Sequence, residues 1–249
     1  MYQEERIYKI LQLLKEQKTL SNQDIMESLQ VSRDTARRDI IRLVEEGGAI
    51  RTHGGIALPV IADEIQEYRV RFGMNPEEKA AIADAALPFV KEEQLCFFDV
   101  STTVFHLCRL LSAPLLCYTN SLDNLTVLME RGIDVHLIGG KVNVKNRFVY
   151  GGEALAMLEK LHFDIAFLGA AAIHEDGFYV ADQEDAIIKN IVAKRSEKVF
   201  VLAGQEKNRK RGRYQTLSFS DVNYLITSGE MPPQVREPMQ KAGIQIIGG

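Results

Sequence analysis

Apolar residues in the first 45 positions recur at helical spacing in three successive segments. Along residues 4–17 they occupy the i, i+3, i+4 and i+7 positions of one helix face, at Ile7, Ile10, Leu11 and Leu14. The second segment, residues 22–29, is separated from the third only by residues 30–31, and the third stops at Gly47-Gly48. The pattern therefore predicts three helices, with a tight turn between the last two.

Capping residues stand in front of both later helices. Ser21 can cap the second helix, and Asp24 occupies the N3 position of a capping box. Leu20 and Ile25 can form a hydrophobic staple across this cap. Ser32 can cap the third helix. We therefore expect the two helices to begin at residues 22 and 33.

The third helix has two unlike faces when its residues are projected at about 100° each. The apolar face must pack on the first two helices and carries Ala36, Ile40, Leu43 and Val44. The opposite face carries Asp34, Thr35, Arg38, Arg42 and Glu45, with Arg37 on its flank. Such a face is often a solvated surface whose arginines pair with nearby acids. The alternative is the second helix of a helix-turn-helix, which enters the major groove of DNA.

The residues after the third helix favour the second alternative. Residues 49–58 alternate apolar and polar side chains around Gly54-Gly55, which predicts a small β-hairpin. Arg51 and His53 could contact phosphate or the minor groove from this hairpin. A Gly-Gly turn alone is common, but a capped helix, a tight turn, an arginine-bearing helix and a basic hairpin in this order are typical of a winged helix that binds DNA.

From residue 76 onward, apolar runs of strand length alternate with helical segments. The strands are expected at 94–100, 114–120, 135–140, 163–173, 198–204, 222–228 and 244–249. This alternation predicts an α/β fold with a parallel or mostly parallel sheet covered by helices on both faces. We therefore predict a DNA-binding domain at 1–58, a linker at 59–75 and an α/β domain at 76–249.

Polar residues and glycines collect where these strands end. Ligands of such sheets bind at the carboxyl ends of the strands. The ends carry residues 99–103, residues 119–121, residues 139–141 and Lys207. Serine and threonine at these places can simply cap the following helices, or their hydroxyls and the backbone N–H groups can bind a phosphate. The residues alone leave both interpretations open.

Composition narrows the class of protein further. The 249 residues are 46% hydrophobic and 26% charged, which is typical of a folded chain. The net charge is −4, and residues 1–58 hold as many acids as Lys and Arg, so a DNA surface must arise from how the charges are distributed. The three cysteines lie in apolar surroundings and the five histidines form no cluster, so we expect reduced thiols, no metal and no cofactor. No apolar run of about 18 residues and no secretory leader is present, so we expect a cytoplasmic protein without membrane contact.

Residues 20–58 resemble the winged helix of the DeoR/GlpR family of bacterial transcription regulators. The matching positions are Ser32, Thr35, Arg37, Arg38 and Asp39 in the helix and Arg51, His53, Gly54 and Gly55 in the wing. Ala36 departs from the Ile or Val that is usual in the family. The pattern and the resemblance together predict a DNA-binding set of Ser21, Asn22, Ser32, Arg33, Thr35, Arg37, Arg38, Arg42, Arg51 and His53.

Residues 76–249 resemble the sensor domain of the same family, whose fold is akin to ribose-5-phosphate isomerase. The predicted effector-binding residues are Lys79, Asp99, Ser101, Thr102, Thr103, Thr119, Asn120, Ser121, Gly140, Lys141, Asp164, Glu184, Lys189 and Lys207. Two positions depart from the usual family pattern, because Ser101 replaces a glycine and Gly204 replaces an aspartate. Both departures bear on which ligand is bound and count against isomerase chemistry.

The sequence therefore predicts a transcriptional repressor of a carbohydrate-metabolism operon and no enzymatic activity. The expected partners are double-stranded operator DNA, a phosphorylated sugar or related effector, and further copies of the chain in a dimer or tetramer. One alternative is a sugar-phosphate isomerase or deaminase with a DNA-binding head, in which Glu184, Asp164 and Lys207 would be the acid and base. Another is a C-terminal domain that serves only oligomerisation.

Overall fold

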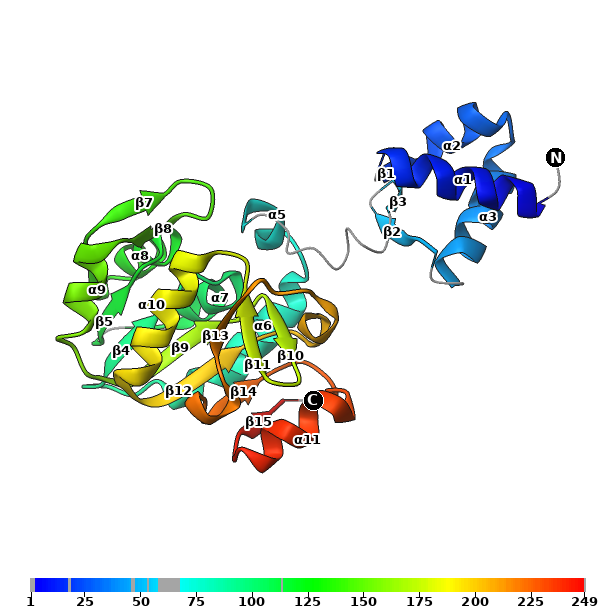
Figure 1. Ribbon diagram of the computed structural model, residues 1–249. Coiled ribbons are helices and arrows are strands. Elements are labelled where there is room, and N and C mark those ends of the chain that lie inside the picture. Colours follow the sequence, from blue (N-terminus) through cyan, green and yellow to red (C-terminus); the bar gives the residue numbers. More distant parts are fainter. Residues whose placement is uncertain are drawn as a thin grey trace. The chain divides into compact units, whose positions relative to one another are not determined.

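The chain divides into two compact units, Met1–Glu64 and Ile65–Gly249 (Figure 1). A computed structural model describes residues 3–17, 19–45, 48–52, 54–57, 68–112 and 114–248. Among these residues, no helix is long and apolar enough to cross a lipid bilayer. The two units are described separately below, as the N-terminal unit and the C-terminal unit.

The N-terminal unit contains the three predicted helices, α1 (Gln3–Gln17), α2 (Asn22–Leu29) and α3 (Arg33–Glu45). The capping box at the start of α2 is confirmed, since Ser21 Oγ accepts from the backbone N–H of Asp24 at 3.0 Å. Asp24 Oδ2 in turn accepts from the backbone N–H of Ser21 at 2.8 Å. Local capping therefore determines where this helix begins.

Three short strands complete this unit, with β3 (Gly55–Ala57) between β1 (Thr19–Ser21) and β2 (Ile50–Thr52). The predicted hairpin of β2 and β3 is present. The strand β1 was not predicted, because three residues with a single apolar side chain show no periodicity. Gly55 permits the close approach of β1, since a Cβ there would lie 2.0 Å from the carbonyl oxygen of Leu20. The apolar helix faces meet beneath this sheet in a core of Ile10, Leu14, Leu20, Ile25, Ile40, Leu43 and Ile56.

The C-terminal unit is built on a seven-stranded sheet in which every neighbouring pair is parallel. Its order is β15 (Gln245–Ile247), β14 (Tyr224–Ile226), β12 (Ser196–Leu202), β9 (Phe163–Gly169), β4 (Leu95–Phe98), β5 (Leu116–Thr119) and β6 (Asp134–Leu137). The chain starts at β4 in the interior, proceeds to the β6 edge and then continues from β9 to the other edge. The strand order thus reverses between β4 and β9, the place where such sheets hold ligands.

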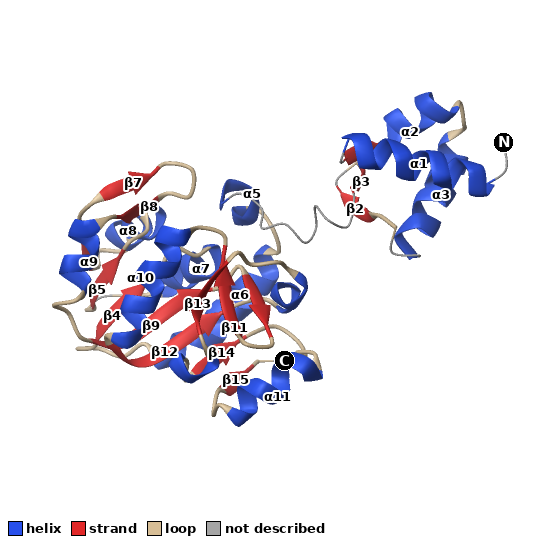
Figure 2. Ribbon diagram, in the orientation of Figure 1, coloured by secondary structure: helices blue, strands red, loops and turns tan. Residues whose placement is uncertain are grey.

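Helices cover both faces of this sheet, as predicted (Figure 2). One face packs on α6 (Pro76–Ala86), α7 (Thr102–Leu110) and α8 (Leu122–Glu130). The other packs on α9 (Gly152–Leu158), α10 (Gln183–Lys194) and α11 (Pro233–Lys241). Successive residues of β4 point to opposite faces, so Phe97 belongs to one core and Phe98 to the other.

Several short elements were not predicted. A hairpin of β7 (Lys141–Asn143) and β8 (Phe148–Tyr150) follows β6, and β10 (Ala172–His174), β11 (Gly177–Val180) and β13 (Tyr214–Leu217) form a small antiparallel sheet. The remaining short helices are η1 (Leu87–Phe89), η2 (Gln205–Arg209) and η3 (Phe219–Asp221). Within the range expected as linker, residues 68–72 form α5 (Tyr68–Phe72), because the buried Tyr68 ring joins the core of the C-terminal unit.

Candidate functional site

The N-terminal unit presents an arginine-bearing surface on α3 and β2. Arg33, Arg37, Arg38 and Arg51 are exposed, and among the described residues no salt bridge involves any of them. Asp39, an acid on the same helix, is buried and is paired with Arg6 of α1 at 2.6 Å. The arrangement favours a surface open to an external anion over a self-neutralised helix face.

A groove of about 420 Å³ lies on this surface, lined by Asn22, Arg33, Asp34, Ala36, Arg37, Ile40 and Arg51. It brings together the start of α2, one side of α3 and the wing strand β2. Three arginines line the groove, two from α3 and one from β2, and their guanidinium groups suit the phosphate backbone of a duplex. Ala36 forms part of the floor, so the residue in which this chain departs from the usual family pattern lies inside the groove.

The other predicted DNA-binding residues differ in their surroundings. Ser21, Asn22 and Ser32 are exposed, and Ser32 Oγ accepts from the backbone N–H of Thr35 at 3.3 Å, which caps α3. Arg42 is half-buried and donates to Gln3 Oε1 of α1 at 3.2 Å, so it ties two helices together. His53 lies outside the described residues.

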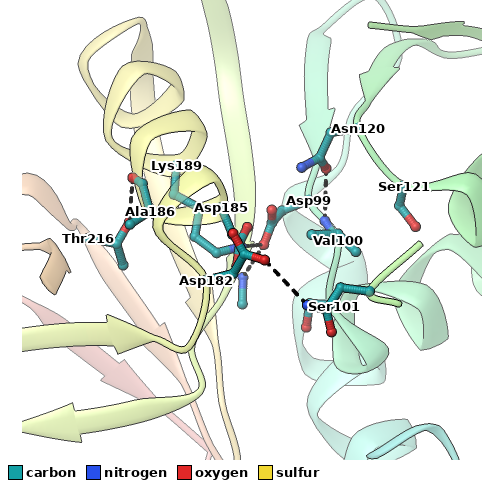
Figure 3. A network of polar contacts seen from close by, with 12 residues as sticks. Asp99, Val100, Ser101, Asn120, Ser121, Asp182, Asp185, Ala186, Lys189 and Thr216 are labelled. Carbon is teal, nitrogen blue, oxygen red and sulfur yellow. Dashed lines mark hydrogen bonds and ion pairs between the residues drawn. The ribbon is translucent and has the colours of Figure 1, made fainter. Parts of the chain in front are cut away.

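In the C-terminal unit, charged groups meet at the carboxyl ends of β4 and β9. Asp99 is fully buried, and its Oδ2 accepts from the backbone N–H of Gly169 at 2.9 Å and from Lys189 Nζ. Lys189 Nζ also lies 2.9 Å from Asp185 Oδ1, one helical turn earlier on α10. Figure 3 shows Lys189 and Asp185 reaching from α10 toward Asp99. Two predicted residues, Asp99 and Lys189, are therefore brought together, and Asp185 joins them.

Electrostatics couples the members of this cluster. Burial and the nearby Asp99 raise the pKa of Asp185, against the opposing effect of Lys189. Burial lowers the pKa of Lys189, but the two carboxylates outweigh it and the net shift is upward. A lysine held between two buried carboxylates is fixed in its charged form. Such a lysine organises the site and is not available as a neutral nucleophile or base.

Buried polar atoms without a partner point into the same region. Among the described residues, Asp99 Oδ1, Asn120 Nδ2 and Arg71 Nε are buried and make no hydrogen bond. Asn120 Oδ1 accepts from the backbone N–H of Val100 at 2.9 Å, which fixes the orientation of its amide (Figure 3). Buried polar groups are nearly always satisfied in proteins, so this cluster is typical of a place that receives a polar ligand.

The hydroxyl residues at the strand ends mostly cap helices. Ser101 Oγ accepts from the backbone N–H of Thr103 at 3.2 Å at the start of α7. Ser121 Oγ accepts from the backbone N–H of Asn124 at 3.2 Å at the start of α8. Thr119 Oγ1 donates to the carbonyl oxygen of Phe98 at 2.6 Å. The structural role is thus visible for these three residues, whereas Thr102 lines a cavity.

That cavity measures about 30 Å³ and is lined by Arg71, Met74, Asn75, Lys79, Thr102, Ala171, Glu206, Lys207 and Lys210. Its wall carries four basic side chains and a single carboxylate, from Glu206, which pairs with Lys207 at 2.9 Å. Burial and the charge of Lys207 lower the pKa of Lys79 to about 8. We call this cavity, together with the Asp99–Lys189–Asp185 cluster, the effector site.

Four further predicted residues lie away from the effector site. Asp164 lies near the start of β9, and its Oδ2 accepts from the backbone N–H of Leu95, the first residue of β4, at 2.6 Å. Both atoms lie at the amino end of the sheet, opposite the ligand end. Gly140 makes the turn into β7, where a Cβ would lie 2.4 Å from the carbonyl oxygen of Tyr150, and Lys141 is exposed. Glu184 lies half-buried in the first turn of α10, and its neighbour Asp185 meets Lys189.

Several residues of the effector site were not predicted from the sequence, among them Asp185, Glu206 and Arg71. Asp185 had a visible signal, because it stands four positions before Lys189 on one helix and such pairs face each other. Glu206 also had one, since it adjoins Lys207 in a short segment after β12. Arg71 had none, because it lies in a five-residue helix inside the expected linker.

At position 204, where glycine replaces the aspartate that is usual in the family, the structure leaves no room for a side chain. A Cβ at this position would lie 2.2 Å from Glu206 Oε2 and 2.6 Å from Glu78 Oε1. The space that a side chain would need is therefore occupied by two carboxylates. The negative charge beside Lys207 is supplied by Glu206 in this chain.

Comparison with known proteins covers both units. The DeoR-like helix-turn-helix domain matches residues 6–61, and the DeoR C terminal sensor domain matches residues 74–229. The HTH-type transcriptional repressor GlcR of Bacillus subtilis is 34% identical over 99% of this chain and 96% of its own length. The HTH-type transcriptional regulator GlpR of Haloferax volcanii is 30% identical over 98% of this chain and 97% of its own. The glycerol-3-phosphate regulon repressor of Escherichia coli is 26% identical over 99% of both chains.

Among solved structures, ribose 5-phosphate isomerase A of Methanocaldococcus jannaschii is similar over 53% of this chain and 54% of its own, with 18% identity and a TM-score of 0.40. A likeness at this level says nothing about activity. The two domain matches and the full-length relatives agree with the winged helix and the parallel α/β unit described above. The chain therefore belongs to the DeoR family of transcriptional regulators.

Proposed function

We propose that this regulator represses a carbohydrate-metabolism operon and that its C-terminal unit binds a phosphorylated sugar or a related anionic metabolite. The arginine surface of α3 and β2 supports the DNA-binding part, because its guanidinium groups have no acidic partner among the described residues. The effector part rests on one observation: a cavity walled by Arg71, Lys79, Lys207 and Lys210 opens beside buried, unsatisfied polar atoms. The names of the relatives, a glycerol-3-phosphate regulon repressor among them, support the same chemistry.

Control of DNA binding by the effector requires that the effector bind two states of the protein with unequal affinity. In the proposed mechanism the effector lowers the affinity for operator DNA by favouring a conformation in which the winged helices fit their half-sites poorly. A single winged helix buries limited surface on DNA, so at least two copies acting on repeated half-sites are expected.

An enzymatic role has less support. The acid and base candidates Glu184, Asp164 and Lys207 do not share one site, since Asp164 lies at the amino end of the sheet. Lys207 is paired with Glu206, and Lys189 is held between Asp99 and Asp185. Turnover of ribose 5-phosphate or glucosamine 6-phosphate by the purified protein would contradict the proposal that it is not an enzyme.

The DNA-binding part predicts unequal effects of arginine and lysine substitutions. Arg37→Ala and Arg38→Ala should each weaken binding about tenfold or more, because each removes a guanidinium aimed at DNA. Lys9→Ala should change binding less than about twofold, since Lys9 is exposed on α1, outside the arginine surface. Fluorescence anisotropy with a duplex selected from a random pool measures all three, and affinity should also fall steeply with salt. Equal losses in the three variants would contradict the assigned surface.

A further inference from the structure

The cavity of the effector site is too small for the ligand that its charge suits. Small-molecule sites in proteins usually measure about 300–1,000 Å³. The space here is about 30 Å³, which holds roughly two water molecules. A sugar phosphate can therefore enter only if part of the wall moves.

Seven of the nine residues that line the cavity fall into two groups. Lys79, Thr102, Glu206 and Lys207 belong to elements packed on the central sheet or directly following its strands. Arg71, Met74 and Asn75 belong to α5 and to the turn behind it. The second group is a continuous stretch of chain that contributes no strand to the sheet.

The short helix α5 is held to the C-terminal unit by few contacts. Tyr68 is buried, and the Phe72 ring lies 4.7 Å from the ring of Phe105 on α7. Val70 is 52% exposed and Met74 is 39% exposed, so the rest of the segment covers little apolar surface. Five residues are too few for a helix that is stable by itself. The position of α5 therefore depends on tertiary contacts: the burial of Tyr68, the contact of Phe72 with Phe105, and the contacts of Arg71 with the effector site.

Those contacts are polar and incompletely satisfied. Lys79 Nζ donates to the carbonyl oxygen of Arg71, which ties α6 to the end of α5. Burial lowers the pKa of Arg71, while the nearby Asp185, Tyr68 and Asp99 oppose that shift. Arg71 Nε is buried and has no hydrogen-bond partner among the described residues. An anion in the cavity would give both Arg71 and Lys79 a better acceptor than they have now.

We propose that α5 is an effector-dependent strap, in which Arg71 binds the anionic group of the ligand and α5 moves when the ligand enters. The proposal rests on the proposed function, because it takes the ligand to be a phosphorylated metabolite. Residues 58–67 join α5 to β3 of the wing along the chain, so α5 is the described element of the C-terminal unit that follows the winged helix directly in sequence. Arg71 thus has two roles, as a ligand contact and as the residue that couples the effector site to the DNA-binding unit.

Hydrogen exchange on the full-length protein tests the movement. Exchange of peptides covering residues 68–75 is compared without ligand, with inorganic phosphate and with a panel of sugar phosphates, and α11 serves as an internal reference. A bound ligand should change exchange in residues 68–75 and leave α11 unaltered. Binding with unchanged exchange in residues 68–75 would overturn the strap and leave the proposed function intact. Failure of every phosphate compound to bind would overturn both.

Substitution of Arg71 tests the coupling. In Arg71→Ala the affinity for the ligand should fall about 10- to 100-fold, as expected for a lost charge-assisted hydrogen bond. Release of DNA by the ligand, measured relative to the DNA affinity of the same variant without ligand, should be lost. Arg71→Lys should recover part of the affinity, and Arg109→Ala, an exposed arginine on α7, should behave as wild type. An Arg71→Ala protein that keeps both ligand affinity and ligand-induced release would overturn the proposal.

Discussion

At the scale of single residues, burial decides what each charged group does. Asp39 and Asp34 lie on the same helix, but Asp39 is buried against α1 and Asp34 faces the groove. Asp185 and Glu184 are neighbours, and Asp185 alone pairs with Lys189. Charge and residue type could be read from the sequence in both cases. The spacing of four residues also favoured Lys189 as the partner of Asp185, whereas no local pattern indicated that Asp39 pairs with Arg6, 33 positions away.

Asp39 should be essential for the stability of the N-terminal unit. Its carboxylate accepts from Arg6 Nε at 2.6 Å and from Gln3 Nε2 at 3.0 Å, which joins α3 to α1. Asp39→Asn puts an amide N–H₂ where two donors already point and removes the charge that Arg6 requires. The variant should melt at a lower temperature, with faster hydrogen exchange confined to α1 and α3. Asp34→Asn is the matched control, and an equal effect of both substitutions would contradict this role for Asp39.

Lys79 should make effector binding dependent on pH. Its pKa is lowered to about 8 by burial and by Lys207 and Arg71, against Glu206 and Glu78. Below pH 8 the ammonium is present and can pair with an anion, and above pH 8 it is lost, so affinity should fall as the pH rises through this value. Near pH 8.5, binding of the anion should be accompanied by uptake of a proton, because the bound anion raises the pKa of Lys79 back toward its usual value.

Titration calorimetry in buffers of different ionisation enthalpy measures this proton uptake. Lys79→Gln should lower the affinity at pH 7 and abolish the uptake. Lys141→Gln should alter neither quantity, because Lys141 is exposed on β7, outside the cavity. If proton uptake persists in the Lys79→Gln protein, another group is responsible.

At the scale of elements, capping residues determined the helix boundaries and tertiary contacts determined the short strands. The second helix begins at residue 22 as predicted, because Ser21 and Asp24 satisfy two backbone N–H groups locally. The strands β1, β7, β8, β10, β11 and β13 were missed, since runs of three or four residues show no periodicity. They exist because a partner strand from elsewhere in the chain supplies their hydrogen bonds.

Removal of the cap should weaken α2 measurably. Ser21→Ala deletes the oxygen that accepts from Asp24 N–H and should lower the stability of the N-terminal unit by about 1 kcal/mol. Ser28→Ala makes the same change at an exposed position in the last turn of α2, where alanine favours the helix, and should not destabilise it. Urea denaturation measures the stability of each variant, and hydrogen exchange of the backbone amides of α2 shows whether the loss is in this helix. Equal stability of both proteins would show that the capping box contributes nothing.

At the scale of the whole molecule, the order of strands creates the effector site. Asp99 and Gly169 are 70 positions apart in the sequence and meet because β4 pairs with β9 at the point where the strand order reverses. The sequence predicted parallel strands and polar residues at their ends, but several strand orders are compatible with the same pattern. Arg71 lay outside every predicted element and reaches the site only because the buried Tyr68 anchors α5 there.

The sequence alone determined what depends on near neighbours along the chain. Helical periodicity, N-caps and the Gly-Gly turn of the hairpin act over a few residues, so the winged helix and the alternating α/β pattern could be read directly. The tertiary structure alone decided which buried charges pair and which end of the sheet each residue occupies. It also placed Arg71 of α5 in the wall of the cavity. These features depend on desolvation and on contacts between residues distant in sequence, which no local pattern encodes.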